Sequence, residues 1–121
     1  MRDQRDLTGG RMAEFGIAVA RAADGTLWVS PAGELDLHTV PEFLAVLRRV
    51  LSEEPSVLLD LRRLTFIDSQ GLGALVQCAK LAGDCDFRLA GGNAAFGRLA
   101  EITGLHHILR LVELPDYEPP A

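Results

Sequence analysis

Residues 65–76 read TFIDSQGLGALV, and this stretch decides how the chain is organised. A β-branched and aromatic run ends at Asp68, Ser69 follows at once, and Gly71 and Gly73 stand one residue apart. Apolar residues then recur at helical spacing up to a stop near Gly83. They are Leu72, Leu75, Val76 and Ala79. The pattern predicts a strand-to-helix junction with Ser69 at the tip of the helix.

Ser69 has two interpretations at this point. As an N-cap it would contribute about 1 kcal/mol to the helix, but Gly71 and Gly73 would each cost about 1 kcal/mol relative to alanine. The glycines therefore suggest clearance for another backbone or for a partner's active site. An exposed hydroxyl at the positive end of a helix also suits a phosphoacceptor. The residues alone leave both the cap and the regulatory tip open.

Upstream of this stretch, the sequence predicts a hairpin and a helix. FGIAVARA (15–22) and TLWVSPAG (26–33) flank an Asp-Gly turn, which is typical of two antiparallel strands. Thr39 and Glu42 have the spacing of a capping box before a helix that ends by Pro55. The apolar face of that helix is formed by Val40, Phe43, Leu44, Leu47, Val50 and Leu51.

The remaining segments alternate between strand and helix. VLLDL (57–61) and CDFRLAGG (85–92) are predicted strands, and Asn93 is expected to cap a helix that closes at Gly104. HILRLVEL (107–114) fits either a short strand or a helix. Strands joined through helices run parallel, so we expect an α/β fold. Its mixed sheet would have four to five strands, an N-terminal antiparallel hairpin and about four helices.

The composition describes one domain with an acidic surface. The 121 residues are 48% apolar and carry a net charge of −5, which disfavours nucleic acid and anionic membranes as partners. We expect a flexible arm at 1–13, a domain at 14–114 and a tail at 115–121. No segment resembles a signal peptide or a membrane span. Cys78 and Cys85 lack metal-ligand spacing, which favours reduced thiols in a cytoplasmic protein.

Two enzymatic interpretations fit the residues poorly. A serine hydrolase would need a glycine where Ile67 stands before Ser69. A phosphorylated receiver domain could use Asp60 as acceptor. It would also need an acidic pair and a lysine, but the single lysine, Lys80, falls inside a helix.

Two ligand sites are also poorly supported. AGGNAAFG (90–97) lies between a strand and a helix but matches no nucleotide-binding motif, and a strand stop with an Asn cap explains it. His106 and His107 are adjacent, so their side chains point apart, and no further ligand lies at metal-binding spacing. We therefore expect no cofactor and no metal.

Three segments together resemble the STAS domain, in particular the stand-alone anti-sigma factor antagonists of the SpoIIAA and RsbV type. They are GELDLHT (33–39), LLDLRRLTFIDSQGLGAL (58–75) and LAEITGLHHILRL (99–111). The similarity covers about residues 15–113. Each motif alone is weak, but the set is specific.

This resemblance implies a regulatory binding protein without catalysis. Its unphosphorylated form would bind an anti-sigma factor that is also an ATP-dependent serine kinase, and so free the sigma factor. Phosphorylation of Ser69 would switch it off, and a PP2C-type phosphatase would restore it. Partner-binding residues carried over from the family are Asp36, Asp68, Ser69, Gln70, Gly71, Leu72 and Gly73. The free protein is expected to be a monomer.

The sequence departs from the family in two places. Many members have a second serine where this chain has Gln70, so Ser69 is the single candidate acceptor at the tip. A proline-containing turn that is frequent in the family is replaced by AGGNAAF (90–96), a departure that concerns this loop and not the Ser69 site. STAS domains also serve as non-phosphorylated scaffold subunits of signalling or lipid-transport complexes, and for such a protein Ser69 would be only a cap.

Overall fold

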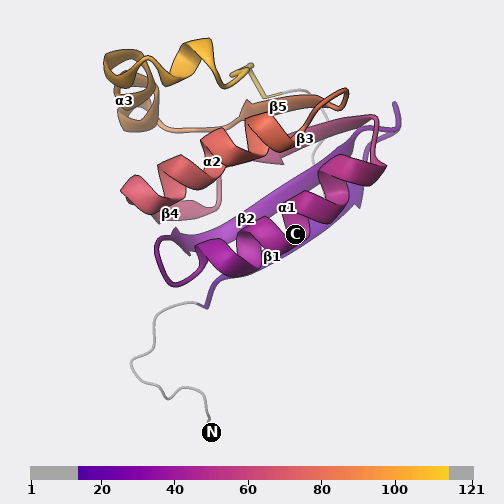
Figure 1. The fold of residues 1–121 in the computed structure, drawn as a ribbon, viewed down its shortest axis with the longest axis horizontal. Coiled ribbons are helices and arrows are strands. Elements are labelled where there is room, and N and C mark those ends of the chain that lie inside the picture. The colour runs from indigo at the N-terminus through magenta and orange to yellow at the C-terminus, as the bar shows by residue number, and fades with distance from the viewer. Residues whose placement is uncertain (1–13, 115–121) are drawn as a thin grey trace, which may run out of the picture.

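A computed structural model describes residues 14–114, and the predicted arm (1–13) and tail (115–121) lie outside the described residues. One mixed β-sheet carries two helices side by side on one face, and a third helix lies beyond the β5 side of the sheet (Figure 1). No helix in the described part of the chain is long and apolar enough to cross a membrane.

The sheet has five strands, and β2 (Leu27–Leu35) is its longest. β1 (Gly16–Arg21) pairs antiparallel with β2, as the hairpin pattern predicted. On the other edge of β2, β3 (Ser56–Asp60) runs parallel to its first half, and β5 (Asp86–Ala90) runs parallel to β3. The predicted α/β class and the N-terminal hairpin are confirmed.

β4 (Leu64–Ile67) is the extended segment that leads into the predicted strand-to-helix junction, but the sequence did not identify it as a separate strand of the sheet. It pairs parallel with the second half of β2, where Gly33 lies opposite Leu64 and Leu35 opposite Ile67. Four residues give too short an alternation to identify a strand with certainty. The segment is a strand because its backbone pairs with the end of β2, a contact that the local sequence does not reveal.

The helices cover one face of the sheet because each has one apolar side. α1 (Val40–Glu53) and α2 (Ser69–Leu81) pack against each other and against the sheet. The main core lies between these layers and is formed by fully buried side chains such as Phe43, Leu47 and Leu75. A smaller cluster on the opposite face surrounds Trp28.

The cap of α1 differs from the predicted capping box. Thr39 does precede the helix, but its side chain makes no capping hydrogen bond. Its hydroxyl instead donates to the Glu34 carbonyl at 2.7 Å and accepts from the Asp36 amide at 3.0 Å. The threonine therefore closes the loop before α1.

The C-terminal third was predicted in part. Asn93 caps α3 (Ala94–Thr103) by accepting the Phe96 N–H at 2.8 Å, and the helix ends at Gly104, both as expected. The segment 107–114 is neither a full strand nor an α-helix. A 3-10 turn, η1 (Leu105–His107), is followed by one bridge between Leu111 and Leu89. The described chain thus has three α-helices and a 3-10 turn, where about four helices were expected.

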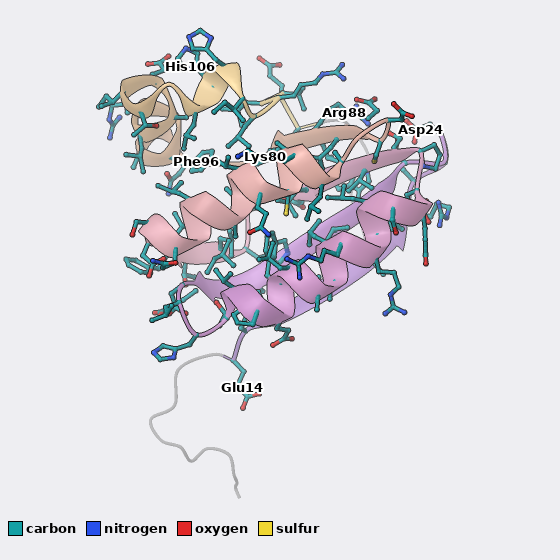
Figure 2. The ribbon with its side chains drawn as sticks, in the orientation of Figure 1. Glu14, Asp24, Lys80, Arg88, Phe96 and His106 are labelled. Atoms are coloured by element: carbon teal, nitrogen blue, oxygen red, sulfur yellow. The ribbon has the colours of Figure 1, made fainter. Side chains whose placement is uncertain are left out.

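The hairpin turn and the start of α2 lie at opposite ends of the sheet. The hairpin turn with Asp24 lies near Arg88 at one end, and α2 begins at the other (Figure 2). The second end collects the residues that the sequence singled out.

Candidate functional site

The candidate site forms where β2 and β4 end side by side. These strands run parallel, and Leu35 lies opposite Ile67 in their register. Asp36 and Asp68 each follow one residue later, and the Asp68 amide donates to the Leu35 carbonyl at 3.3 Å. Because parallel strands end at the same edge of a sheet, two acids distant in sequence become neighbours beside the start of α2.

Asp68, and not Ser69, is the N-cap of α2. Its carboxylate accepts the Gly71 N–H at 2.9 Å, and its backbone is extended as a cap requires. Ser69 is the first helical residue. It is exposed, and its hydroxyl makes no hydrogen bond within residues 14–114. The cap interpretation of Ser69 is therefore wrong, and the hydroxyl is open to solvent at the positive end of the helix.

The two glycines of the tip have different surroundings. A Cβ on Gly71 would lie 2.4 Å from the Leu35 carbonyl oxygen and 2.7 Å from Cγ1 of Ile67. The close approach of α2 to the end of β2 thus requires this glycine. Gly73 is exposed, and a Cβ there would meet nothing within 4 Å. The predicted clearance for another backbone holds at Gly71, while Gly73 leaves the outer surface of α2 flat.

Asp36 shapes the loop between β2 and α1. Its carboxylate accepts the backbone N–H groups of His38 at 2.9 Å and Thr39 at 3.1 Å. This Asx-type turn fixes the half-buried acid in place next to the tip. Its structural role was not visible in the sequence, which suggested only an acid facing a partner.

The other residues predicted for this site differ in how exposed they are to solvent. Gln70 is exposed beside Ser69, Leu72 is half-buried, and Gly71 is buried. The surface that a partner could touch therefore consists of Ser69, Gln70 and Gly73, bordered by the two acids.

Two exposed apolar side chains at this end of the sheet were missed. Leu37, in the loop after Asp36, is 62% exposed, and Phe66, opposite Glu34 in the β2–β4 register, is 52% exposed. Isolated exposed apolar residues are common, but these two lie next to the strand ends that carry Asp36 and Asp68. The signal in the sequence was Leu37, an apolar residue within a polar turn.

Asp60, the acceptor in the receiver interpretation, is a structural residue. It is 3% exposed, and its carboxylate binds the Arg62 guanidinium through Nε at 3.0 Å and Nη2 at 2.8 Å. Burial opposes ionisation, but the side-chain and backbone hydrogen bonds from Arg62 and the charges of Arg62 and Arg63 outweigh it. Together they hold the pKa of Asp60 below its usual value. A carboxylate enclosed in this way is not placed to attack a phosphoryl donor.

The cysteines and histidines form no reactive centre. Both cysteines are free thiols, and burial raises the pKa of Cys78 to about 12. The pKa of Cys85 is also raised, by burial and then by the neighbouring Asp86 and Glu54. Within residues 14–114 no group of three His, Cys, Asp or Glu side chains could hold a metal ion.

Comparison with known proteins agrees with this architecture. The STAS domain family model matches residues 18–115. The anti-sigma-B factor antagonist of Staphylococcus aureus (strain NCTC 8325 / PS 47) is 33% identical over 93 residues, which cover 74% of this chain and 86% of that protein. An anti-sigma factor antagonist from Mycobacterium paratuberculosis superposes with a TM-score of 0.71 at 27% identity. That match covers 81% of this chain and 85% of that one.

A more distant protein shares the fold alone. The phosphorylated form of the Bacillus cell fate determinant SpoIIAA superposes with a TM-score of 0.64 at 17% identity, covering 84% of this chain and 93% of that one.

The chain belongs to the STAS domain family. Within it, the chain is a member of the anti-sigma factor antagonist group, of the SpoIIAA and RsbV type. Proteins of this group are regulators and not enzymes, and the partner that the group implies is an anti-sigma factor.

Proposed function

We propose that this protein is a phosphorylation-switched antagonist with Ser69 as the switch. In its unphosphorylated form it binds an anti-sigma factor that is also a serine kinase, and this binding releases the sigma factor. The observation that carries the proposal is the exposed Ser69 hydroxyl at the first position of α2, which makes no hydrogen bond to any part of the described chain (14–114). We place the protein in the cytoplasm, in agreement with its free cysteines.

The switching reaction is a phosphoryl transfer on which this chain acts as substrate. Ser69 Oγ forms the new O–P bond, the bond between the γ-phosphorus of ATP and its bridging oxygen breaks, and ADP leaves. The kinase takes the hydroxyl proton and supplies Mg²⁺. A PP2C-type phosphatase reverses the modification by hydrolysis. The chain needs no cofactor of its own.

The switch acts on the interface more than on the fold. A phosphate adds about −1.5 to −2 charges at Ser69, next to Asp68 and close to Asp36, and the helix dipole of α2 partly offsets this charge within the domain. The partner surface is complementary to a neutral Ser69 hydroxyl and to the surface at Gly73, which has no side chain. The phosphate group removes this complementarity and places a concentrated negative charge against the partner. Repulsion and steric exclusion then release the kinase.

A non-phosphorylated scaffold was the alternative function. It explained Ser69 as a helix cap, and Asp68 takes that role instead. An exposed Ser69 that does not cap α2 therefore favours the switch over the scaffold.

Binding to the cognate kinase tests the proposal. The expected result is that Ser69→Ala binds as tightly as the wild type and stays bound in the presence of ATP, whereas Ser69→Glu binds at least about tenfold more weakly, a difference of about 1.4 kcal/mol. Calorimetry with purified anti-sigma kinases from the same genome measures both. Ser52 is an exposed serine in the last turn of α1, so Ser52→Glu is the matched control for charge.

Two outcomes would contradict the switch. Ser69→Glu could bind like the wild type, or Ser52→Glu could weaken binding as much as Ser69→Glu does.

A further inference from the structure

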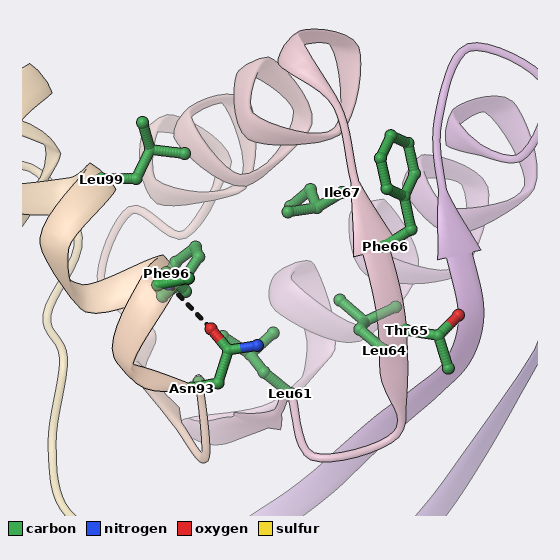
Figure 3. A pocket seen from close by; sticks show the side chains of 10 residues that line it. Leu61, Leu64, Thr65, Phe66, Ile67, Asn93, Phe96 and Leu99 are labelled. Carbon is green, nitrogen blue, oxygen red and sulfur yellow. Dashed lines mark hydrogen bonds between the residues drawn. The ribbon is translucent and has the colours of Figure 1, made fainter.

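A groove of about 210 Å³ lies between β4 and α3. Figure 3 shows Ile67 pointing from β4 toward Phe96 and Leu99 of α3, with Leu61 and Asn93 at the base. Every residue that lines the groove is uncharged, although about a quarter of the chain is charged.

The topology explains why this space is not filled. β5 continues the sheet beyond β3, but β4 pairs only with β2 among the described strands, so its outer edge has no strand partner. α3 stands opposite that edge and has one fully buried residue, Ala100, while Phe96 and Leu99 are only half-buried. An apolar side of α3 and an open strand edge thus face each other across the groove.

The lining of the groove ends at the residue that precedes the N-cap of α2. Ile67 lines it, and the next two residues in the chain are Asp68 and Ser69. Phe66, at the rim, is 52% exposed. A partner seated over the first turn of α2 would therefore sit within two residues of a side chain that lines the groove.

We propose that the β4–α3 groove is an anchor for an apolar side chain of the same anti-sigma kinase, and that this anchor is insensitive to phosphorylation. This inference rests on the proposed function, because it takes the partner to be the protein that docks on Ser69. The protein would then contact its kinase at two points, of which only the tip responds to phosphate.

The chemistry of the lining selects the occupant. A groove of about 210 Å³ has room for several waters, and the polar groups that could bind them, in Thr65, Asn93 and the open edge of β4, are all uncharged. An aromatic or branched aliphatic side chain that displaces this water gains hydrophobic free energy. An anion or cation would find no opposite charge there.

The same chemistry explains why phosphate does not disturb the anchor. Charge added at Ser69 acts on charged and polar groups, and it is screened over a Debye length of about 8 Å at physiological salt. Burial of a neutral apolar side chain against neutral walls has no charge for the phosphate to act on. Phosphorylation should therefore weaken the complex at the tip and leave the groove contribution unchanged.

Two neighbouring alanines give a matched test. Ala95 lines the groove and Ala94 does not, and both are exposed in the first turn of α3. Ala95→Trp fills the groove, whereas Ala94→Trp adds the same side chain outside it. Ala95→Leu is a smaller filler, and thermal melting of all three verifies the fold.

The affinity of the purified kinase is measured for each alanine variant, with Ser69 intact and with Ser69→Glu. We expect Ala95→Trp to weaken binding about tenfold in both backgrounds, equivalent to about 1.4 kcal/mol. Ala95→Leu should weaken it by a smaller factor, and Ala94→Trp should leave it unchanged. Equal factors in the two backgrounds show that the anchor and the switch are independent.

Several results would overturn the anchor while the switch stands. In the first, Ala95→Trp binds like Ala94→Trp and Ser69→Glu is still weakened. In the second, Ala95→Trp has an effect only when Ser69 is intact. In the third, sedimentation detects a dimer of the wild type that Ala95→Trp abolishes, which assigns the groove to a second copy. Conversely, if Ser69→Glu and wild type bind equally, or neither binds, the proposed function fails and the anchor fails with it.

Discussion

The two glycines near Ser69 show how differently one residue type can serve a helix. Gly71 faces the carbonyl oxygen of Leu35 across a gap that no Cβ can enter, whereas Gly73 faces open space. Gly71 is therefore needed for the fold, and Gly73 is available for a partner contact.

Gly71→Ala and Gly73→Ala are predicted to change stability in opposite directions. The Cβ of Gly71→Ala would overlap backbone, and overpacking of this kind costs about 1–3 kcal/mol. Gly73→Ala should raise the free energy of unfolding by about 0.5–1 kcal/mol, because alanine is the better helix former. Urea denaturation of the two variants measures both values. If Gly71→Ala were as stable as the wild type, the close approach of α2 to β2 would be wrong.

Ser69 illustrates what the sequence could and could not predict about a single residue. The strand-to-helix junction followed from a β-branched run that ends before helical spacing begins. The capping side chain belongs to the last residue before the helical backbone begins. That residue is Asp68, and a helix starting one residue later would have made Ser69 the cap. Both side chains are good caps, so the assignment needed the structure.

At the scale of elements, the link between β3 and β4 depends on an ion pair whose carboxylate is buried. Asp60 ends β3, and the Arg62 side chain and amide both donate to its carboxylate. The Arg62 side chain is itself 34% exposed, so the pair is only partly shielded from solvent.

Asp60→Asn is predicted to lower stability and to flatten its dependence on pH. The pKa of Asp60 is lowered in the folded state. Its stabilisation is therefore complete above the unfolded pKa of about 3.9 and is lost as the pH falls through the lower folded value. Asp60→Asn should lower the free energy of unfolding at pH 7 by about 1–3 kcal/mol. The free energy of unfolding of this variant should also fall less steeply from pH 5 to pH 2 than that of the wild type.

Urea denaturation across this pH range provides the measurement. Asp84→Asn, which removes the same charge from the exposed turn after α2, is the control. A profile for Asp60→Asn that parallels the wild type down to pH 2 would contradict the role of the ion pair.

Elements with a long repeating pattern were predicted well, and so were the short strands β3 and β5, whereas β4 was not given as a strand of its own. The hairpin, α1, α2 and α3 follow from alternation or helical spacing over many residues. β4 spans four residues, and its identity as a strand comes from the extended end of β2. The β4–α3 groove has no sequence signal at all, because it reflects a strand edge left open by the sheet topology.

At the scale of the whole molecule, the site combines elements that are distant in sequence at one end of the sheet. The loop after β2, the end of β4 and the first turn of α2 all meet there, away from the hairpin turn at the other end (Figures 1 and 2). Phosphorylation would change the net charge of the whole chain from −5 to roughly −7, and all of the added charge would lie at this end of the sheet. The fold should tolerate this change, because Ser69 is exposed and lies at the positive end of α2.

The measurement that tests the central claim most directly is the mass of the full chain after incubation with the purified kinase and Mg²⁺-ATP. The wild type should gain about 80 Da, the mass of one phosphoryl group, and peptide mapping should locate it at Ser69. Ser69→Ala should gain nothing. No added mass on the wild type in the presence of a kinase that binds it, or an undiminished gain on Ser69→Ala, would contradict the assignment of Ser69 as the switch.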